Sequence, residues 1–313
     1  MKGKGWILGG LLLCGLLFAC QSDPAVDGSG AKEAALATAV PRETPTATAA
    51  PSPVPAAKTE DASSPRSEAP ETSRPTPAQE STSAPITVER LDGGEFDSYF
   101  DDAIFVGDSV TKCLSNYVQK TRSKNKSFMG KARFLGTVSM TLWQASRNEP
   151  AFDYRGKKIP LTQGLQQTEA KKAFILLGGN DVWRRDWAEV EGLYVDLIQL
   201  IRRECPDVQI ILQGILPVSE NYCRNHSLTI GHWNDFNQVL ERVCAEQGVA
   251  YYYFGQQLMD ENGYLDPALA EGDVHPSDAG DAVWVRALRA YAARQMYPDA
   301  LVLYPPTEDG DGR

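Results

Sequence analysis

Short apolar runs alternate with amphipathic stretches from residue 103 onward. The runs AIFVG, KARFLG, KAFILLGG and VQIILQGI have strand length and are mainly apolar, whereas the stretch 187–204 repeats its apolar positions with helical spacing. Nearly continuous apolar strands are typical of parallel sheets covered on both faces. Their alternation with helices favours helical layers on those faces. The pattern therefore predicts an α/β fold, a three-layer α/β/α sandwich with a central parallel sheet.

The N-terminus has a different pattern. Lys2 and Lys4 precede an apolar run that is too short for a transmembrane helix and has the layout of a secretory signal. The run closes in LFAC, which resembles a bacterial lipobox. We therefore expect residues 1–20 to be a lipoprotein signal peptide and Cys20 to carry a lipid anchor. The expected location is the extracellular face of a bacterial membrane.

Residues 21–86 contain no Phe, Trp or Tyr and are rich in Pro, Ala, Ser and Thr. Such a segment buries too little apolar surface to offset the entropy of ordering it. We expect a disordered tether that reaches about 45 Å as a coil and about 200 Å as polyproline. Residues 87–313 then form the globular head.

Charge and cysteine usage narrow the function classes. The chain has a formal net charge of -10 and no basic run, which argues against a nucleic-acid partner. The head has four cysteines without a CxxC pair, so disulfides and buried free thiols both remain open. Cys223, His226 and His232 have metal-like spacing but no recognised fourth ligand, so we expect solvated loop residues and no metal. The oligomeric state is left open.

Three short motifs follow predicted strands or precede a predicted helix. Gly107-Asp108-Ser109 follows the first strand, where Ser109 is either a helix cap or a reactive hydroxyl at a helix N-terminus. Asn180 lies in GGND after the third strand, and His275 lies in VHPSDAG before the last helix. Because the carboxyl ends of parallel strands meet at one crevice, these groups are expected to lie close together.

Together the motifs resemble the SGNH/GDSL hydrolase superfamily, and more narrowly a group of Gram-positive surface proteins. The resemblance spans 100–297 and implies an SGNH-type, flavodoxin-like sandwich without a cofactor. It implies that Ser109 is the nucleophile and His275 the base, oriented by a nearby acid. The oxyanion would be held by the Ser109 amide, the Asn180 side chain and one backbone amide after the second strand.

Two positions depart from the family pattern. The family acid stands three residues before the histidine, where this chain has Gly272. We favour Asp273 as the acid, with Glu271 or a Ser–His pair assisted by a backbone carbonyl as alternatives. The second oxyanion amide is assigned to Gly136, with Val138 as the alternative. The remaining motif carboxylates, Asp108 and Asp181, are expected to hydrogen-bond neighbouring loops.

These residues predict a cell-surface serine esterase that removes small acyl groups, O-acetyl above all, from a carbohydrate. Four tryptophans near strand ends could stack on sugar rings or simply pack in the core: Trp143, Trp183, Trp187 and Trp233. Two other functions stay open. One is a cell-wall glycan O-acyltransferase, although this chain has no many-helix membrane domain to supply a donor. The other is a non-catalytic module on the same fold that binds a glycan or a partner.

Overall fold

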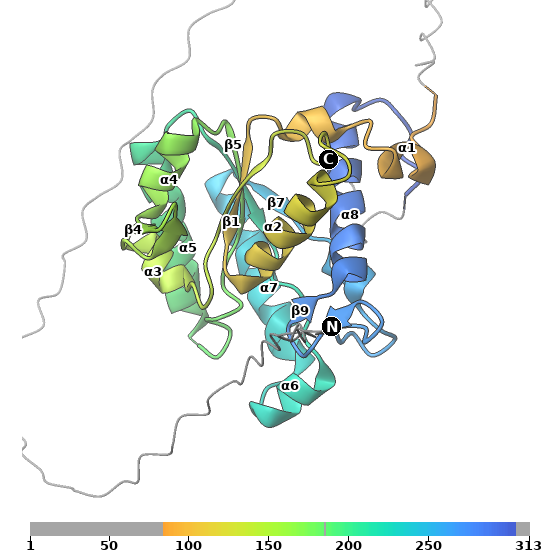
Figure 1. Cartoon of the computed structure of the whole chain (residues 1–313). Helices are drawn as coiled ribbons and strands as arrows, with labels where there is room; N and C mark the ends of the chain where they lie inside the picture. Colours follow the sequence, from red (N-terminus) through yellow and green to blue (C-terminus); the bar gives the residue numbers. More distant parts are fainter. Residues whose placement is uncertain (1–83, 185, 305–313) are drawn as a thin grey trace, which may run out of the picture. The chain divides into compact units, whose positions relative to one another are not determined.

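The computed structural model describes residues 84–184 and 186–304, and five parallel strands form its central sheet (Figure 1). In spatial order they are β2 (Arg133–Gly136), β1 (Ala103–Gly107), β5 (Lys172–Leu176), β6 (Gln209–Gln213) and β7 (Ala250–Tyr252). The chain moves from β1 to β2 on one side and then crosses to β5 on the other. The order therefore reverses between β1 and β5, and the carboxyl ends of these two strands flank the switch point at which such sheets bind ligands.

Helices cover both faces of the sheet. One face carries α3 (Leu142–Ser146), α4 (Leu161–Thr168), α5 (Trp187–Glu204) and α7 (Ile230–Gln247). The other carries α2 (Ser109–Arg122) and α8 (Asp278–Met296), with α1 (Val88–Asp92) and the 3-10 helix η1 (Asp97–Phe100) beside them (Figure 1). Side chains alternate along each strand, so Ile104 and Val106 enter the first core while Phe105 enters the second. This arrangement confirms the predicted three-layer sandwich.

Several small elements lie outside the repeating pattern. They are the hairpin β3 (Phe152–Tyr154) and β4 (Lys157–Ile159), the helix α6 (Glu220–Asn225), the 3-10 helix η2 (Gly255–Leu258), and the pair β8 (Ala270–Glu271) and β9 (His275–Pro276). The strands of these pairs have two or three residues, too few to show a hydrophobic period. The sequence pattern therefore did not predict them, although β9 carries His275.

The long elements follow the predictions closely. The helix predicted at 187–204 is α5, with the same bounds. Helix α7 begins at Ile230, where Thr229 and His232 form a capping box. At the N-terminal end, Ile86 is buried and pairs with Val302, so ordered structure includes the last predicted tether residue.

The predicted signal peptide, Cys20 and nearly all of the tether lie outside the described residues. Within the described ranges, no helix is both long enough and apolar enough to cross a membrane. The four head cysteines, all described, are free thiols here: Cys113, Cys205, Cys223 and Cys244.

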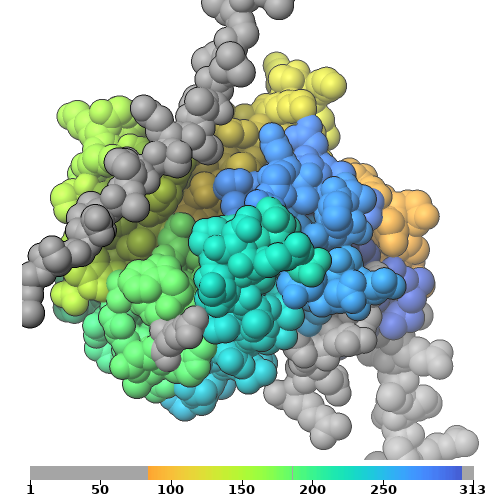
Figure 2. Space-filling model, turned by 90° about the horizontal axis from the view of Figure 1, so that it is seen from below, coloured from red at the N-terminus to blue at the C-terminus, as the bar shows by residue number. Residues whose placement is uncertain are grey.

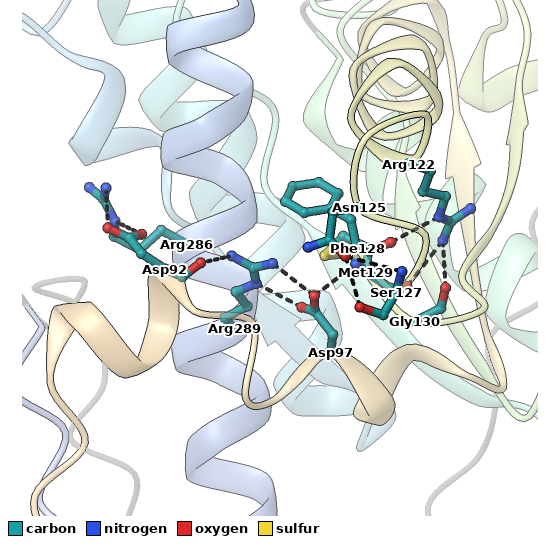
Figure 3. Close-up of polar contacts among 10 residues, drawn as sticks. All are labelled: Asp92, Asp97, Arg122, Asn125, Ser127, Phe128, Met129, Gly130, Arg286 and Arg289. Atoms are coloured by element: carbon teal, nitrogen blue, oxygen red, sulfur yellow. Dashed lines mark hydrogen bonds and ion pairs between the residues drawn. The ribbon is translucent and has the colours of Figure 1, made fainter.

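Two ion pairs fasten the segment before β1 to helix α8 (Figure 3). Arg289 is buried and donates to both carboxylate oxygens of Asp97, at 2.7 and 2.8 Å. Asp97 also accepts from the backbone N–H of Met129 at 2.9 Å. The neighbouring pair, Arg286 with Asp92, is more exposed. The buried pair thus ties three segments together at the edge of the sheet opposite the carboxyl ends of the strands.

Candidate active site

Ser109 begins α2 directly after β1. Asp108 is the N-cap of this helix, and its Oδ1 accepts from the Val110 N–H at 2.9 Å. The turn requires glycine at 107, because a Cβ there would lie 2.1 Å from the Thr111 hydroxyl and 2.4 Å from the Leu176 carbonyl oxygen. The Ser109 amide is among the first N–H groups of the helix, which have no partner inside the helix and favour negative charge. The position can therefore serve both a cap and a nucleophile.

His275 lies on β9 and faces Ser109 across 166 residues of sequence. Its Nε2 is 2.9 Å from Ser109 Oγ, so the hydroxyl can donate to the ring. Partial burial lowers the pKa of His275 by disfavouring the imidazolium, and the carboxylate of Glu271 opposes this by raising it. The ring is therefore available as a neutral base near neutral pH, which a proton acceptor for serine must be.

The two candidate acids have different surroundings. Asp273 accepts from Ser219 Oγ at 2.5 Å and from Asn221 Nδ2 at 3.2 Å, so it connects the histidine loop to the start of α6. Glu271 instead is the residue paired with His275 in the antiparallel β8–β9 register. Directly paired residues project to the same face with Cβ atoms about 4.5–5.5 Å apart. Among the described contacts, the only hydrogen bond of the His275 ring is the one with Ser109.

Asn180 follows β5 and points toward the first motif. Its Nδ2 donates to Asp108 Oδ2 at 3.2 Å and to the Met140 carbonyl at 2.9 Å. An amide nitrogen has two hydrogens, so an oxyanion formed at Ser109 would compete with one of these acceptors. The bond to Asp108 is the longer of the two. Asn180 therefore joins the loops after β1, β2 and β5 at one point.

The second predicted oxyanion amide lies in the loop after β2. Gly136 packs tightly on α2, since a Cβ there would lie 2.7 Å from the Lys112 nitrogen. This packing accounts for glycine at 136 independently of catalysis. The Thr137 N–H donates to the Gly107 carbonyl at 3.0 Å, and Val138, one residue later, is exposed. Gly136 and Val138 both remain candidates for the second donor.

Two buried carboxylates support the site. Burial raises the pKa of Asp108 to about 7, with a smaller contribution from the neighbouring carboxylate of Asp181, while hydrogen bonds from backbone N–H groups oppose the shift. Burial also raises the pKa of Asp181, while hydrogen bonds and Arg184 oppose this. Asp181 accepts from the Leu142 N–H at 2.7 Å, so it holds the loop after β5 against α3. These contacts match the loop-bonding roles expected for both residues.

A small pocket of about 100 Å³ opens beside Ser109 and Asn180. Its other walls are mostly apolar and come from Val110, Leu176, Ile215, Leu216, Val218, Tyr222, Trp233 and Val274. Figure 2 looks onto this edge of the molecule, where the teal helix α6 and the blue histidine loop lie side by side. Sequence reasoning did not identify Tyr222 or the Val218 loop as pocket walls, because their apolar character alone does not distinguish them from core residues.

The three residues with metal-like spacing make local contacts: Cys223, His226 and His232. The His226 ring stacks on Tyr222 at 4.0 Å between centroids, and His232 Nδ1 accepts from the Thr229 N–H at the start of α7. Cys223 is buried. Within the described ranges, no group of three or more His, Cys, Asp and Glu side chains is arranged to hold a metal ion.

Comparisons with known proteins give a family match and similar folds. The model of the GDSL-like Lipase/Acylhydrolase family matches residues 105–283. A GDSL-like lipase from Bacteroides thetaiotaomicron is similar in structure, with a TM-score of 0.50 and 15% identity over 62% of this chain and 89% of that one. A catalytic mutant of an acetylxylan esterase from Geobacillus stearothermophilus gives a TM-score of 0.43 and 18% identity over 61% and 93%. No curated protein has a significant sequence match to the chain.

Proposed function

The chain belongs to the GDSL-like lipase/acylhydrolase family and is a carboxylic ester hydrolase, and from this premise we propose that it removes small acyl groups, above all acetyl, from carbohydrate hydroxyls at a cell surface. The pocket beside Ser109 is the observation that supports a small acyl group in the substrate. Its volume of about 100 Å³ is well below the about 300–1,000 Å³ of sites that hold larger ligands. This size favours a small acyl group such as acetyl over a fatty acyl chain or a sugar ring.

The contacts support a serine mechanism. Ser109 Oγ attacks the ester carbonyl carbon while its proton moves to His275 Nε2. The oxyanion is stabilised by the Ser109 amide and by Asn180, together with one amide from the loop after β2. The bond to the alcohol oxygen then breaks, and that oxygen takes the proton from His275. Water, deprotonated by His275, attacks the acyl-Ser109 ester and releases the carboxylic acid and free Ser109.

For the acid of this mechanism we propose Glu271, because it lies directly across β8–β9 from His275 and raises the pKa of the imidazole. Asp273 would then hold the Ser219 loop, and through it the pocket wall Tyr222. The sequence-based choice of Asp273 as the acid stays the alternative, since its backbone is only two residues from the histidine. A positioning acid orients the base and stabilises its charged form without itself being protonated.

The surface location rests on residues outside the described ranges. Cys20 after an apolar run, followed by a Pro- and Ser-rich tether, supports a lipid-anchored head. Replacing Cys20 by serine in cells that process lipoproteins should release the chain from the membrane fraction. If the variant fractionates with membranes as before, the anchor is not at Cys20.

Hydrolysis of p-nitrophenyl acetate and butyrate by the purified full-length chain tests the esterase. We expect Ser109→Ala to lower kcat/KM for acetate by about 10³-fold or more, and acetate to be preferred over butyrate. Asn180→Ala should cost about 10²–10³-fold in kcat, as for other oxyanion donors. Equal activity of wild type and Ser109→Ala would contradict the proposal. Product analysis with a glycan acceptor distinguishes hydrolysis from acyl transfer.

A further inference from the structure

A second, larger hollow lies beside the loop after β2. It has a volume of about 700 Å³, within the range of about 300–1,000 Å³ found for ligand sites. The loop 137–140 forms one wall, and Gln144, Glu149 and Lys158 supply polar groups. Met140 belongs to this groove, and its carbonyl oxygen accepts from Asn180. Asn180 lines the acyl pocket, so its bond to Met140 connects the two hollows.

Two exposed apolar side chains lie on the loops that Asn180 connects. Among the described residues, six large hydrophobic side chains are exposed, and four of them lie near the C-terminal end of α8 or beyond it: Met296, Tyr297, Leu301 and Leu303. The other two are Val138, after β2, and Trp183, after β5, each 61% exposed. Both loops are joined at Asn180. Single exposed apolar residues are ordinary, but these two lie on loops that both contact Asn180.

Trp183 is also held in a fixed orientation. Its Nε1 donates to the backbone carbonyl of Asn180 at 2.9 Å. The Arg184 guanidinium lies 4.8 Å from the centre of the indole ring, and Arg184 is itself paired with Asp181 and Glu189. A large aromatic surface is thus exposed and held by two contacts, next to Asn180. Such a preorganised ring costs little further entropy when a ligand binds.

We propose that Trp183 and this groove form the subsite for the alcohol part of the ester, and that the alcohol is a pyranose unit of a carbohydrate. A pyranose has one face of C–H groups, which suits an indole ring, and a rim of hydroxyls, which suits Gln144, Glu149 and Lys158. A lipid alcohol would instead need an apolar groove. This assignment rests on the proposed esterase and names the part of the substrate that the acyl pocket cannot hold.

The test measures hydrolysis of two kinds of substrate by the full-length chain. One is p-nitrophenyl acetate, and the other is a panel of O-acetylated cello-, xylo- and chito-tetrasaccharides. The quantity compared is kcat/KM for the best tetrasaccharide divided by kcat/KM for p-nitrophenyl acetate. In Trp183→Ala we expect this ratio to fall about tenfold, mainly because KM for the tetrasaccharide rises. Trp183→Phe, which keeps an aromatic face, should recover part of the ratio. Tyr297→Ala is the matched control, because it removes an exposed aromatic ring at the far end of α8 and should leave the ratio unchanged.

A binding measurement separates this proposal from the esterase itself. In a Ser109→Ala background, calorimetry with the same tetrasaccharides should show binding that weakens about tenfold when Trp183→Ala is added. If Ser109→Ala abolishes ester hydrolysis but Trp183→Ala changes neither the substrate ratio nor binding by more than twofold, the subsite is wrong and the esterase stands. If Ser109 proves dispensable while the glycan still binds through Trp183, the esterase mechanism is wrong and the binding site stands.

Discussion

Glu271 lies directly opposite His275 in the two-residue ladder of β8 and β9, while Asp273, nearer in sequence, bonds to Ser219 and Asn221. The ladder folds back at Gly272, whose φ of +73° favours glycine over an acid at that position. The carboxylate that faces the imidazole is thus set by strand pairing and not by distance along the chain. This relationship leads to a prediction that separates the two acids.

Glu271→Gln should lower kcat by about tenfold and move the acid limb of the kcat/KM profile to lower pH. The Glu271 carboxylate raises the pKa of His275, so its removal lowers that pKa and populates the neutral base at lower pH. The measurement is the pH dependence of p-nitrophenyl acetate hydrolysis. Asp273→Asn is the matched control and should leave the limb in place. If Asp273→Asn moves this acid limb to lower pH and Glu271→Gln does not, the acid is Asp273.

Asp108→Asn should change how stability depends on pH. The pKa of Asp108 is raised from its ordinary 3.8 to about 7 in the folded chain, so its ionisation destabilises the fold as pH rises from about 4 to 7. Asparagine cannot ionise. The difference in Tm between variant and wild type should therefore be more positive at pH 8 than at pH 5.

Asp186→Asn is the control for this stability experiment. Asp186 also caps a helix, α5, but is exposed, so the same exchange there removes no buried carboxylate and should not reproduce the change seen between pH 5 and pH 8 for Asp108→Asn. Equal behaviour of the two variants would show that burial of Asp108 does not oppose its ionisation.

Leu216→Ala should broaden acyl selectivity. Leu216 lines the pocket beside Ser109, and the truncation creates room for the two additional methylenes of a butyryl group. At about 0.8 kcal/mol for each buried methylene, the butyrate-to-acetate ratio of kcat/KM should rise by about tenfold. Leu200→Ala is matched in exposure, both leucines being 6% exposed, but Leu200 lies on α5 away from the pocket. An equal rise in both variants would mean that loosening of the fold, not pocket size, changes selectivity.

Arg289→Met should destabilise the fold by about 3–5 kcal/mol, because it leaves the buried Asp97 carboxylate without its partner. The double variant Asp97→Leu/Arg289→Met should recover much of this loss, since no charge stays buried. Arg286→Ala, which breaks the more exposed pair on the same helix, should cost about 0–1 kcal/mol. Urea unfolding gives the three free energies. A double variant no more stable than Arg289→Met would show that the cost comes from lost packing and not from an unpaired charge.

The amino-acid pattern was enough to predict the layered architecture and to single out three candidate site residues. Apolar runs indicate strands because a sheet covered on both faces excludes polar side chains. The apolar spacing in 187–204 indicates a helix because one face of that helix packs on the sheet. Ser109, Asn180 and His275 stand out because motif residues at strand ends converge in this fold. The structure brings Ser109 and His275 to 2.9 Å and places Asn180 on the same pocket.

Only the tertiary structure decided which partners these residues have. Pairing in β8–β9 involves four residues, too short for any periodic signal, yet it sets Glu271 against His275. The acyl pocket combines side chains from strands, loops and helices far apart in sequence, so its volume depends on packing between layers. The indole of Trp183 is exposed and its N–H bonds to the Asn180 backbone, an arrangement that the apolar character of the residue does not predict. Local patterns record which face a residue prefers, whereas the chemistry of the site depends on contacts between segments that the fold brings together.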